Sequence, residues 1–316
     1  MTDPALFEGF QPLRVDVEDT SIFIRRKGDG PALLLLHGFP QTHLMWHRIA
    51  PALVERFTVV CADLRGHGAS GKPASSTDHA PYAKAAMARD MVQAMEALGH
   101  RRFSVVGHDR GGRVAYRTAL NHPDRVERLA VLDILPTAEA FGRADARFML
   151  GYWPWTLLAQ PEPLPERLLL AAPEAVVDNA LGCWGSEASS FTPDARAAYV
   201  EALSDSATVH AVCEEFRAAA TIDVAHDEAD RAAGRRIECP VLALWSRGGP
   251  LDTWYADAGG SLSIWRAWAP QVVGRAIDGG HFFPEQNAAG TLSELVCFLE
   301  PMTAPSASAT AGARTR

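Results

Sequence analysis

Short apolar runs recur along the chain and alternate with amphipathic stretches, a pattern typical of a sheet covered by helices. Six nearly continuous apolar runs predict buried parallel strands: residues 32–36, 58–61, 103–106, 129–132, 241–244 and 272–276. Two more amphipathic runs, residues 12–17 and 21–25, predict an N-terminal hairpin. Between the strands, helices are predicted over residues 85–98, 114–121 and 293–299. This alternation favours an α/β fold with a doubly wound, mostly parallel sheet.

One long interval interrupts this alternation. About 100 residues separate Asp133 from Val241, far more than a crossover between neighbouring strands needs. The interval has helical patterns around residues 195–203 and 207–220, and it predicts an inserted helical cap over the strand ends, where ligands bind in such sheets. We therefore expect a core made of residues 1–136 and 237–300 and a cap over residues 137–236. Residues 301–316 are rich in Ala, Ser, Thr and Pro and predict a disordered tail.

Composition narrows the class of partners. The net charge of −8 over 316 residues argues against nucleic acid. Five widely spaced cysteines without a C-x-x-C pair argue against a disulfide framework or a zinc site. His43 and His47 share a predicted helical face, but no carboxylate or cysteine accompanies them at ligand spacing, so we expect no metal. The chain has no apolar run of membrane-spanning length and no signal-peptide pattern, so we expect a cytoplasmic protein without a membrane partner.

The segment with the clearest chemistry is Gly107-His108-Asp109-Arg110-Gly111, between an apolar run and a helical stretch expected to begin near Gly112. Strand, sharp turn and helix in this order resemble the nucleophile elbow of the α/β-hydrolase fold, in which a serine usually occupies the position of Asp109. A carboxylate there can attack an sp3 carbon and form an ester, which water then hydrolyses. The exchange of serine for aspartate favours halide displacement or epoxide opening over ester cleavage.

A carboxylate nucleophile needs a base for the second step, and nucleophile, acid and histidine follow one another in this fold. His281 comes after the last predicted strand, in a glycine-rich loop, and is the candidate base. Two residues are candidates for the acid that orients it. Asp133 lies at a strand end between apolar residues, where a carboxylate needs a partner, and Asp252 lies in the loop after the next strand. We favour Asp133, while Asp252 stays open.

Two backbone N–H groups are candidates for an oxyanion hole. One belongs to Phe39, after the strand over residues 32–36, and the other to Arg110, which follows the nucleophile. The side chains of Arg110 and Arg113 share a face in the first turn of the elbow helix, where the helix dipole disfavours cations by about 0.3–1 kcal/mol each. A pair of cations there needs an anion, and we interpret the pair as a clamp for a substrate carboxylate, with Asp109 as the alternative partner.

Several segments together resemble the haloacetate and fluoroacetate dehalogenases of the α/β-hydrolase superfamily, over most of the chain. These segments are residues 37–42, 63–68, 107–113, 133–136, 155–165 and 280–282. The resemblance implies an α/β-hydrolase fold with a cap, no cofactor, and a 2-haloacid and water as reactants. It implies Asp109 as nucleophile, His281 as base, Asp133 as acid, and Arg110 with Arg113 as carboxylate clamp. Relatives are commonly dimers, so a homodimer is expected.

The cap departs from that family at the halide pocket. The resemblance implies Trp155 as a halide donor and Trp184 as a further lining residue, but Pro154 stands where the family has histidine, and Phe216 where it has tyrosine. Hydrogen bonds to charged groups are worth about 1.5–3 kcal/mol each. Loss of two such donors predicts slower release of fluoride, the hardest halide to expel, unless Trp153 supplies one.

The expected function is therefore hydrolytic dehalogenation of haloacetate through an ester on Asp109. The alternative is an epoxide hydrolase with the same Asp109 and His281, which needs cap tyrosines to protonate the epoxide oxygen. Tyr152 and Tyr199 are the candidates. A catalytically silent hydrolase that serves as a binding module is disfavoured by the complete set of nucleophile, base and acid.

Overall fold

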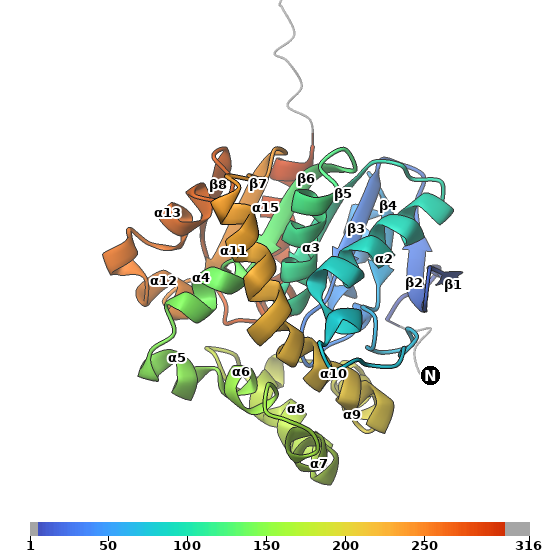
Figure 1. The fold of residues 1–316 in the computed structure, drawn as a ribbon. Coiled ribbons are helices and arrows are strands. Elements are labelled where there is room, and N and C mark those ends of the chain that lie inside the picture. Colours follow the sequence, from blue (N-terminus) through green and yellow to red (C-terminus); the bar gives the residue numbers. More distant parts are fainter. Residues whose placement is uncertain (1–5, 301–316) are drawn as a thin grey trace, which may run out of the picture.

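The computed structural model describes residues 6–300, so the predicted tail over residues 301–316 lies outside the described residues. The described residues form an eight-stranded sheet of order β1-β2-β4-β3-β5-β6-β7-β8 (Figure 1). The strands are β1 (Gln11–Asp16), β2 (Ser21–Lys27), β3 (Ala32–Leu36), β4 (Thr58–Ala62), β5 (Phe103–His108), β6 (Val126–Leu132), β7 (Val241–Ser246) and β8 (Val272–Ile277). From β4 to β8 all neighbours are parallel, whereas β2 is antiparallel to both β1 and β4. The predicted mostly parallel α/β sheet is confirmed.

The central strands are apolar throughout because helices cover both faces of the sheet. Leu33 and Leu35 of β3 point into one core cluster, which also holds side chains of η1 (His43–Trp46), α1 (Ala50–Leu53) and α15 (Ala288–Leu299). Leu34 and Leu36 point to the opposite face, where α2 (Lys84–Ala97) and α3 (Asp109–Asn121) pack. The remaining core elements are η2 (Ala80–Tyr82), α12 (Pro250–Thr253), η5 (Ala256–Ala258), α13 (Ser261–Arg266) and α14 (Phe283–Gln286).

The segment between β6 and β7 is helical. It comprises α4 (Thr137–Gly142), α5 (Ala146–Gly151), α6 (Trp153–Leu157), α7 (Leu164–Ala171), α8 (Pro173–Leu181), η3 (Ala188–Ser190), α9 (Pro193–Leu203), α10 (Ser206–Ala218), the π-helical η4 (Ala219–Asp223) and α11 (Val224–Ala232). Figure 1 shows α5 to α10 gathered at one end of the sheet. Residues after the ends of β3, β5 and β6 share a cavity with residues of these helices, so the cap covers the carboxyl ends of the parallel strands.

Buried charges join the cap to the core. Arg117 on α3 forms ion pairs with Asp227 and Asp230 on α11, and the hydroxyl of Tyr116 donates to Asp227. Loss of one partner of a buried pair typically costs about 3–5 kcal/mol, so these contacts hold α11 firmly against the helix that begins at the elbow.

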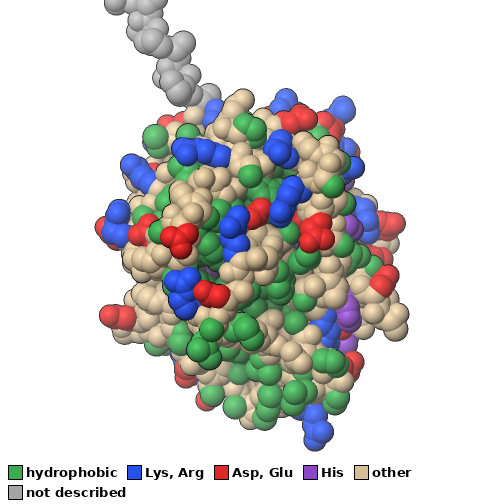
Figure 2. Space-filling view, turned by 60° about the vertical axis from the view of Figure 1, so that its left-hand side comes forward, with side chains coloured by type: hydrophobic (Ala, Val, Ile, Leu, Met, Phe, Trp, Pro, Cys, Tyr) green, Lys and Arg blue, Asp and Glu red, His purple; other side chains and the backbone are tan. Residues whose placement is uncertain are grey.

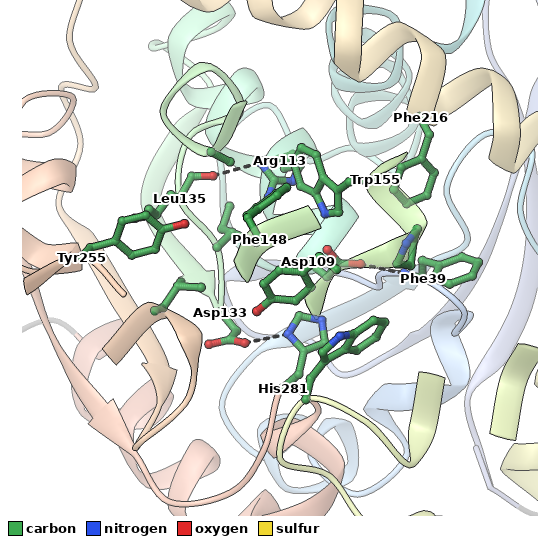
Figure 3. Close-up of a pocket in the computed structure, with 16 residues that line it drawn as sticks. Phe39, Asp109, Arg113, Asp133, Leu135, Phe148, Trp155, Phe216, Tyr255 and His281 are labelled. Carbon is green, nitrogen blue, oxygen red and sulfur yellow. Dashed lines mark hydrogen bonds and ion pairs between the residues drawn. The ribbon is translucent and has the colours of Figure 1, made fainter. Parts of the chain in front are cut away.

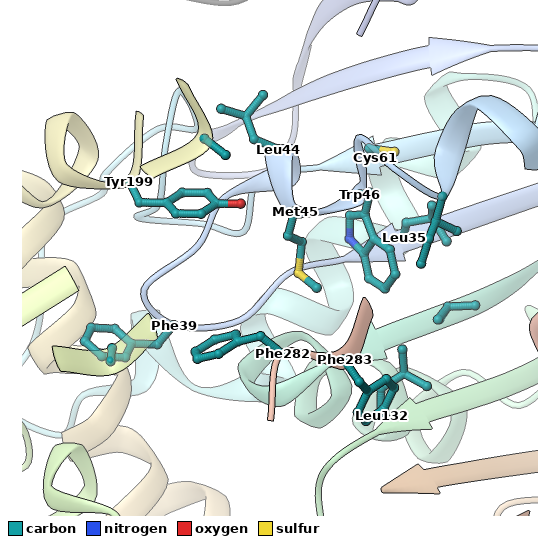
Figure 4. Close-up of a cluster of buried hydrophobic side chains, with 14 of the residues drawn as sticks. Leu35, Phe39, Leu44, Met45, Trp46, Cys61, Leu132, Tyr199, Phe282 and Phe283 are labelled. Carbon is teal, nitrogen blue, oxygen red and sulfur yellow. The ribbon is translucent and has the colours of Figure 1, made fainter. Parts of the chain in front are cut away.

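Apolar packing continues from the core into the loops that carry the candidate site. Phe282 and Phe283, directly after His281, lie in the same buried cluster as Met45 and Trp46, and Figure 4 shows Phe39 at the cap side of this cluster. The loops around the site are therefore held by the core itself.

The cap also carries exposed apolar side chains. Figure 2 shows hydrophobic side chains gathered at the lower end of the molecule, and the exposed large ones of the cap are Met149, Leu150, Leu164, Leu168 and Leu170. Such patches often mark contact surfaces, but the expected homodimer stays a prediction. Within residues 6–300, no helix is both long and apolar enough to span a bilayer.

Candidate active site

The elbow places Asp109 at a sharp turn between β5 and α3. Asp109 has a φ of 45°, in the left-handed region that non-glycine residues seldom adopt. A Cβ on Gly107 would lie 2.3 Å from the carbonyl oxygen of Gly111, and one on Gly111 would lie 2.4 Å from the carbonyl oxygen of His37. The two glycines are therefore required for the helix to start this close to the neighbouring strand.

The carboxylate of Asp109 faces a cavity beneath the cap and accepts a hydrogen bond from the backbone N–H of Phe39, 3.0 Å from Oδ2 (Figure 3). Burial alone would raise the pKa of Asp109, but the positive charges of His281 and Arg110 outweigh it, and the pKa is lowered. Asp109 therefore stays ionised and nucleophilic.

His281 lies next to Asp109 and is oriented by Asp133. Its Nδ1 is 2.6 Å from Oδ2 of Asp133, whose Oδ1 accepts from the N–H of Ser246 at 2.9 Å. Burial lowers the pKa of His281, but the hydrogen bond and charge of Asp133 raise it more. Asp252 accepts bonds from the indole of Trp245 and the N–H of Gly248 at the surface. The carboxylate that contacts His281 in the structure is thus that of Asp133.

The two arginines of the elbow helix have different surroundings. Arg113 lines the cavity, donates from Nη1 to the carbonyl of Leu135 at 2.9 Å, and lies 4.4 Å over the ring of Trp155. Arg110 is not among the lining residues. Its Nε donates to Oε1 of Glu215 on α10 at 3.1 Å, and Phe216 covers the guanidinium at 4.0 Å. The structure thus brings one of the two expected guanidiniums to the cavity.

Arg110 has an anionic partner from the cap, Glu215 on α10. Besides Arg110, it contacts Nζ of Lys84 at 2.8 Å and Nε2 of His67 at 2.8 Å. These positive neighbours overcome the effect of burial and hold the pKa of Glu215 well below its usual range. A glutamate in an amphipathic helix ordinarily suggests a solvated face, so sequence patterns contained no signal for this partner.

The cap residues named from the sequence divide into two groups. Pro154, Trp155, Trp184 and Phe216 line the cavity. Trp153 does not, because its indole N–H donates to Oδ1 of Asn179, 2.8 Å away on the outer side. The structure therefore does not bring the Trp153 indole together with the other expected cap residues. The indole of Trp184 is also engaged, since it donates to the carbonyl of Gly151 at 2.5 Å.

The cavity encloses about 40 Å3, which is room for about three water molecules. Six further residues line the cavity and were not expected from the sequence: Ile134, Leu135, Ala140, Phe148, Leu251 and Tyr255. Tyr152, considered only for the epoxide alternative, lines it as well. Tyr199 does not line the cavity, and its hydroxyl donates to Glu285 at 3.1 Å. Within residues 6–300, no group of three or more His, Cys, Asp or Glu residues is arranged to hold a metal ion.

Comparison with known proteins places this site in a family. The model of the α/β hydrolase fold family matches residues 31–288. A fluoroacetate dehalogenase from Burkholderia sp is 43% identical over 285 residues, which cover 89% of this chain and 91% of that protein. A soluble epoxide hydrolase from Corynebacterium sp. is 29% identical over 87% of this chain and 92% of its own length.

The fold agrees with a solved relative. The crystal structure of ALR0039 from Nostoc sp PCC 7120 is 46% identical, with a TM-score of 0.89 over 93% of this chain and 99% of that one. The chain is therefore a hydrolase of the α/β-hydrolase superfamily and belongs to its haloacetate and fluoroacetate dehalogenase family.

Proposed function

We propose that this protein hydrolyses the carbon–halogen bond of small 2-haloacids, with haloacetate as the simplest substrate and a 2-hydroxy acid as the product. The observation that carries the proposal is an ionised Asp109 in a small cavity that also contains the cation of Arg113 and the Asp133–His281 pair. The nucleophile suits displacement at an sp3 carbon, and the cation suits an acid of two or three carbons.

In the first step, a carboxylate oxygen of Asp109 attacks the α-carbon from the side opposite the halogen. The new C–O bond forms as the C–X bond breaks, and the halide leaves with the electron pair. Trp155 is the cap residue proposed to donate a hydrogen bond to the departing halide. Arg113 holds the substrate carboxylate, so that the α-carbon lies in line with the nucleophile.

In the second step, His281 takes a proton from water, and the resulting hydroxide attacks the carboxyl carbon of Asp109. The charge that develops on the carbonyl oxygen is stabilised by the N–H of Phe39 and that of Arg110, the proposed oxyanion hole. The ester C–O bond then breaks, and the departing alkoxide takes the proton from His281 and leaves as the 2-hydroxy acid. Asp109, left as a carboxylic acid, loses its proton to solvent and is regenerated as the carboxylate. Asp133 keeps the histidine ring in position and stabilises its charged form.

Chloride should be released faster than fluoride. Pro154 and Phe216 line the cavity without a hydrogen-bond donor, and the indole of Trp153 is bonded elsewhere. Loss of two donors to the leaving group predicts C–F cleavage slower by roughly 10² to 10⁴, with less effect on the better leaving groups. Ion chromatography of reactions with chloroacetate and fluoroacetate tests this. Release of neither halide would overturn the proposed function, and equal rates would overturn the role given to Pro154 and Phe216.

Hydrolysis of the ester should depend on pH through His281. The base must be neutral to accept a proton, and its pKa is raised above the ordinary 6.5, so the rate should increase as the pH rises through that raised value. Formation of the ester should show no such dependence, because the pKa of Asp109 is lowered. Single-turnover experiments with chloroacetate separate the two steps. A hydrolysis rate that is already at its maximum below pH 6.5 would contradict the assignment.

A second candidate function has one observation in its favour. The tyrosines Tyr152 and Tyr255 line the cavity, and hydroxyl donors can protonate the oxygen of an opened epoxide. The 29% identity to an epoxide hydrolase also supports this alternative, in which Asp109 and His281 would act in the same two steps. Diol formation from styrene oxide, at a rate above that of chloride release from chloroacetate, would favour this alternative over dehalogenation.

A further inference from the structure

The cavity beneath the cap has two tyrosines that the mechanism above does not use. Tyr152 comes from the cap, directly before α6, and Tyr255 from the core, directly before η5. Both line the same cavity as Asp109 and Arg113, and both are largely buried, with 8% and 7% of their surface exposed. Figure 3 shows the hydroxyl of Tyr255 pointing inward from the core side.

The hydroxyls of these two tyrosines differ from those of the other three in the chain. The Tyr82 hydroxyl donates to the carbonyl of Pro73, that of Tyr116 to Asp227, and that of Tyr199 to Glu285. Those of Tyr152 and Tyr255 have no hydrogen-bond partner among residues 6–300. The hydroxyl of a largely buried tyrosine usually has a partner, so two tyrosines without one on a single cavity point to a ligand that accepts hydrogen bonds.

Arg113 gives this part of the cavity a positive charge. Within the described chain, Nε of Arg113 and Nη1 of Arg110 are both buried without a partner, whereas Nε of Arg110 is bonded to Glu215. Burial raises the pKa of both Tyr152 and Tyr255, so both phenols remain protonated. The negative charges of Asp133 and Asp109 raise the pKa of Tyr152 further, whereas the charge of Arg113 opposes the rise in both tyrosines. Two neutral hydroxyl donors and one cation are complementary to a carboxylate, which accepts hydrogen bonds on both oxygens.

We propose that Tyr152 and Tyr255 complete, together with Arg113, the binding site for the substrate carboxylate. Arg110 also joins the elbow helix to the cap, because its Nε and Nη2 donate to Glu215. This inference rests on the proposed function and deepens it, since two phenols join Arg113 in recognising the acid. It makes both tyrosines determinants of acid specificity.

The test compares an acid with a neutral substrate of the same size. Kinetics of chloride release are measured with chloroacetate and chloroacetamide for the wild type, Tyr152→Phe, Tyr255→Phe and Tyr82→Phe. The last is a matched control, because it loses a hydroxyl outside the cavity. Loss of a hydrogen bond to a charged group predicts a KM for chloroacetate about 10- to 100-fold higher in each cavity variant. The kcat/KM for chloroacetamide should change less than about twofold, and Tyr82→Phe should match the wild type.

Two outcomes would overturn the inference. One is an unchanged KM for chloroacetate in both cavity variants. The other is an equal loss with both substrates, which would assign the hydroxyls to the shared chloromethyl group. If the wild type releases no chloride at all, the proposed function fails separately, and binding of acetate by calorimetry still tests the site. Weaker acetate binding in Tyr152→Phe and Tyr255→Phe than in Tyr82→Phe would then support it, and equal binding in all four proteins would contradict it.

Discussion

Asp109→Asn should abolish halide release from chloroacetate, with a fall in kcat of at least about 10⁴-fold. The amide has no negative charge and is a poor nucleophile, so the carbon–halogen bond has no attacking group. The fold should survive, because asparagine has the same shape and also tolerates the left-handed conformation seen at this position. Chloride release and thermal unfolding of the purified variant measure the two effects.

Asp252→Asn is the matched control for that variant. It removes the same charge from a carboxylate that is bonded to Trp245 and Gly248 outside the cavity. Activity close to that of the wild type is expected. Residual turnover in Asp109→Asn within tenfold of the wild type would exclude Asp109 as the nucleophile, and a large loss in Asp252→Asn would reopen the choice between Asp133 and Asp252 for the acid.

His281→Gln should separate the two chemical steps. Glutamine cannot accept the proton of the attacking water, so ester hydrolysis should slow by about 10² to 10⁴, the usual contribution of a general base. Displacement of halide does not need the base, so a burst of about one chloride per active site should precede the slow phase. Rapid-quench measurement of chloride gives both phases. A variant that turns over without a burst, at the wild-type rate, would contradict the role of His281 as base.

The sheet and its order of elements could be predicted because each buried strand is a nearly continuous apolar run. The run over residues 32–36 coincides with β3. The ends of the strands were harder to predict. The apolar run predicted a strand that ends at residue 106, whereas β5 continues to His108. The elbow helix also begins at Asp109 rather than near Gly112. Its first turn is made of polar residues and glycines that carry no helical periodicity, and close packing against β3 fixes it in place.

The candidate catalytic residues could be predicted, because they follow parallel strands and the fold brings the carboxyl ends of these strands together. Asp109, Asp133 and His281 follow β5, β6 and β8, and the structure places them side by side. The surroundings of a side chain were harder to predict. The two arginines are equivalent as a sequence pattern, but only contacts between distant segments show that Glu215 holds Arg110.

The cap was least predictable in detail. The sequence left Trp153 open as a halide donor besides Trp155, but its indole N–H is bonded to Asn179. On the core side of the cavity, Tyr255 gave no sequence signal either, because an isolated tyrosine after a short helix is compatible with ordinary packing. Cap helices are short and cross at irregular angles, so the direction of each side chain is decided by tertiary packing and not by periodicity.

The proposed mechanism requires a covalent ester between Asp109 and the substrate. The most direct measurement is peptide mapping by mass spectrometry of His281→Gln after brief treatment with chloroacetate. The account predicts a carboxymethyl ester on the peptide that contains Asp109, one per protein chain, and none when Asp109→Asn is combined with His281→Gln. An unmodified Asp109 in protein that has released its burst of chloride would contradict the nucleophilic mechanism.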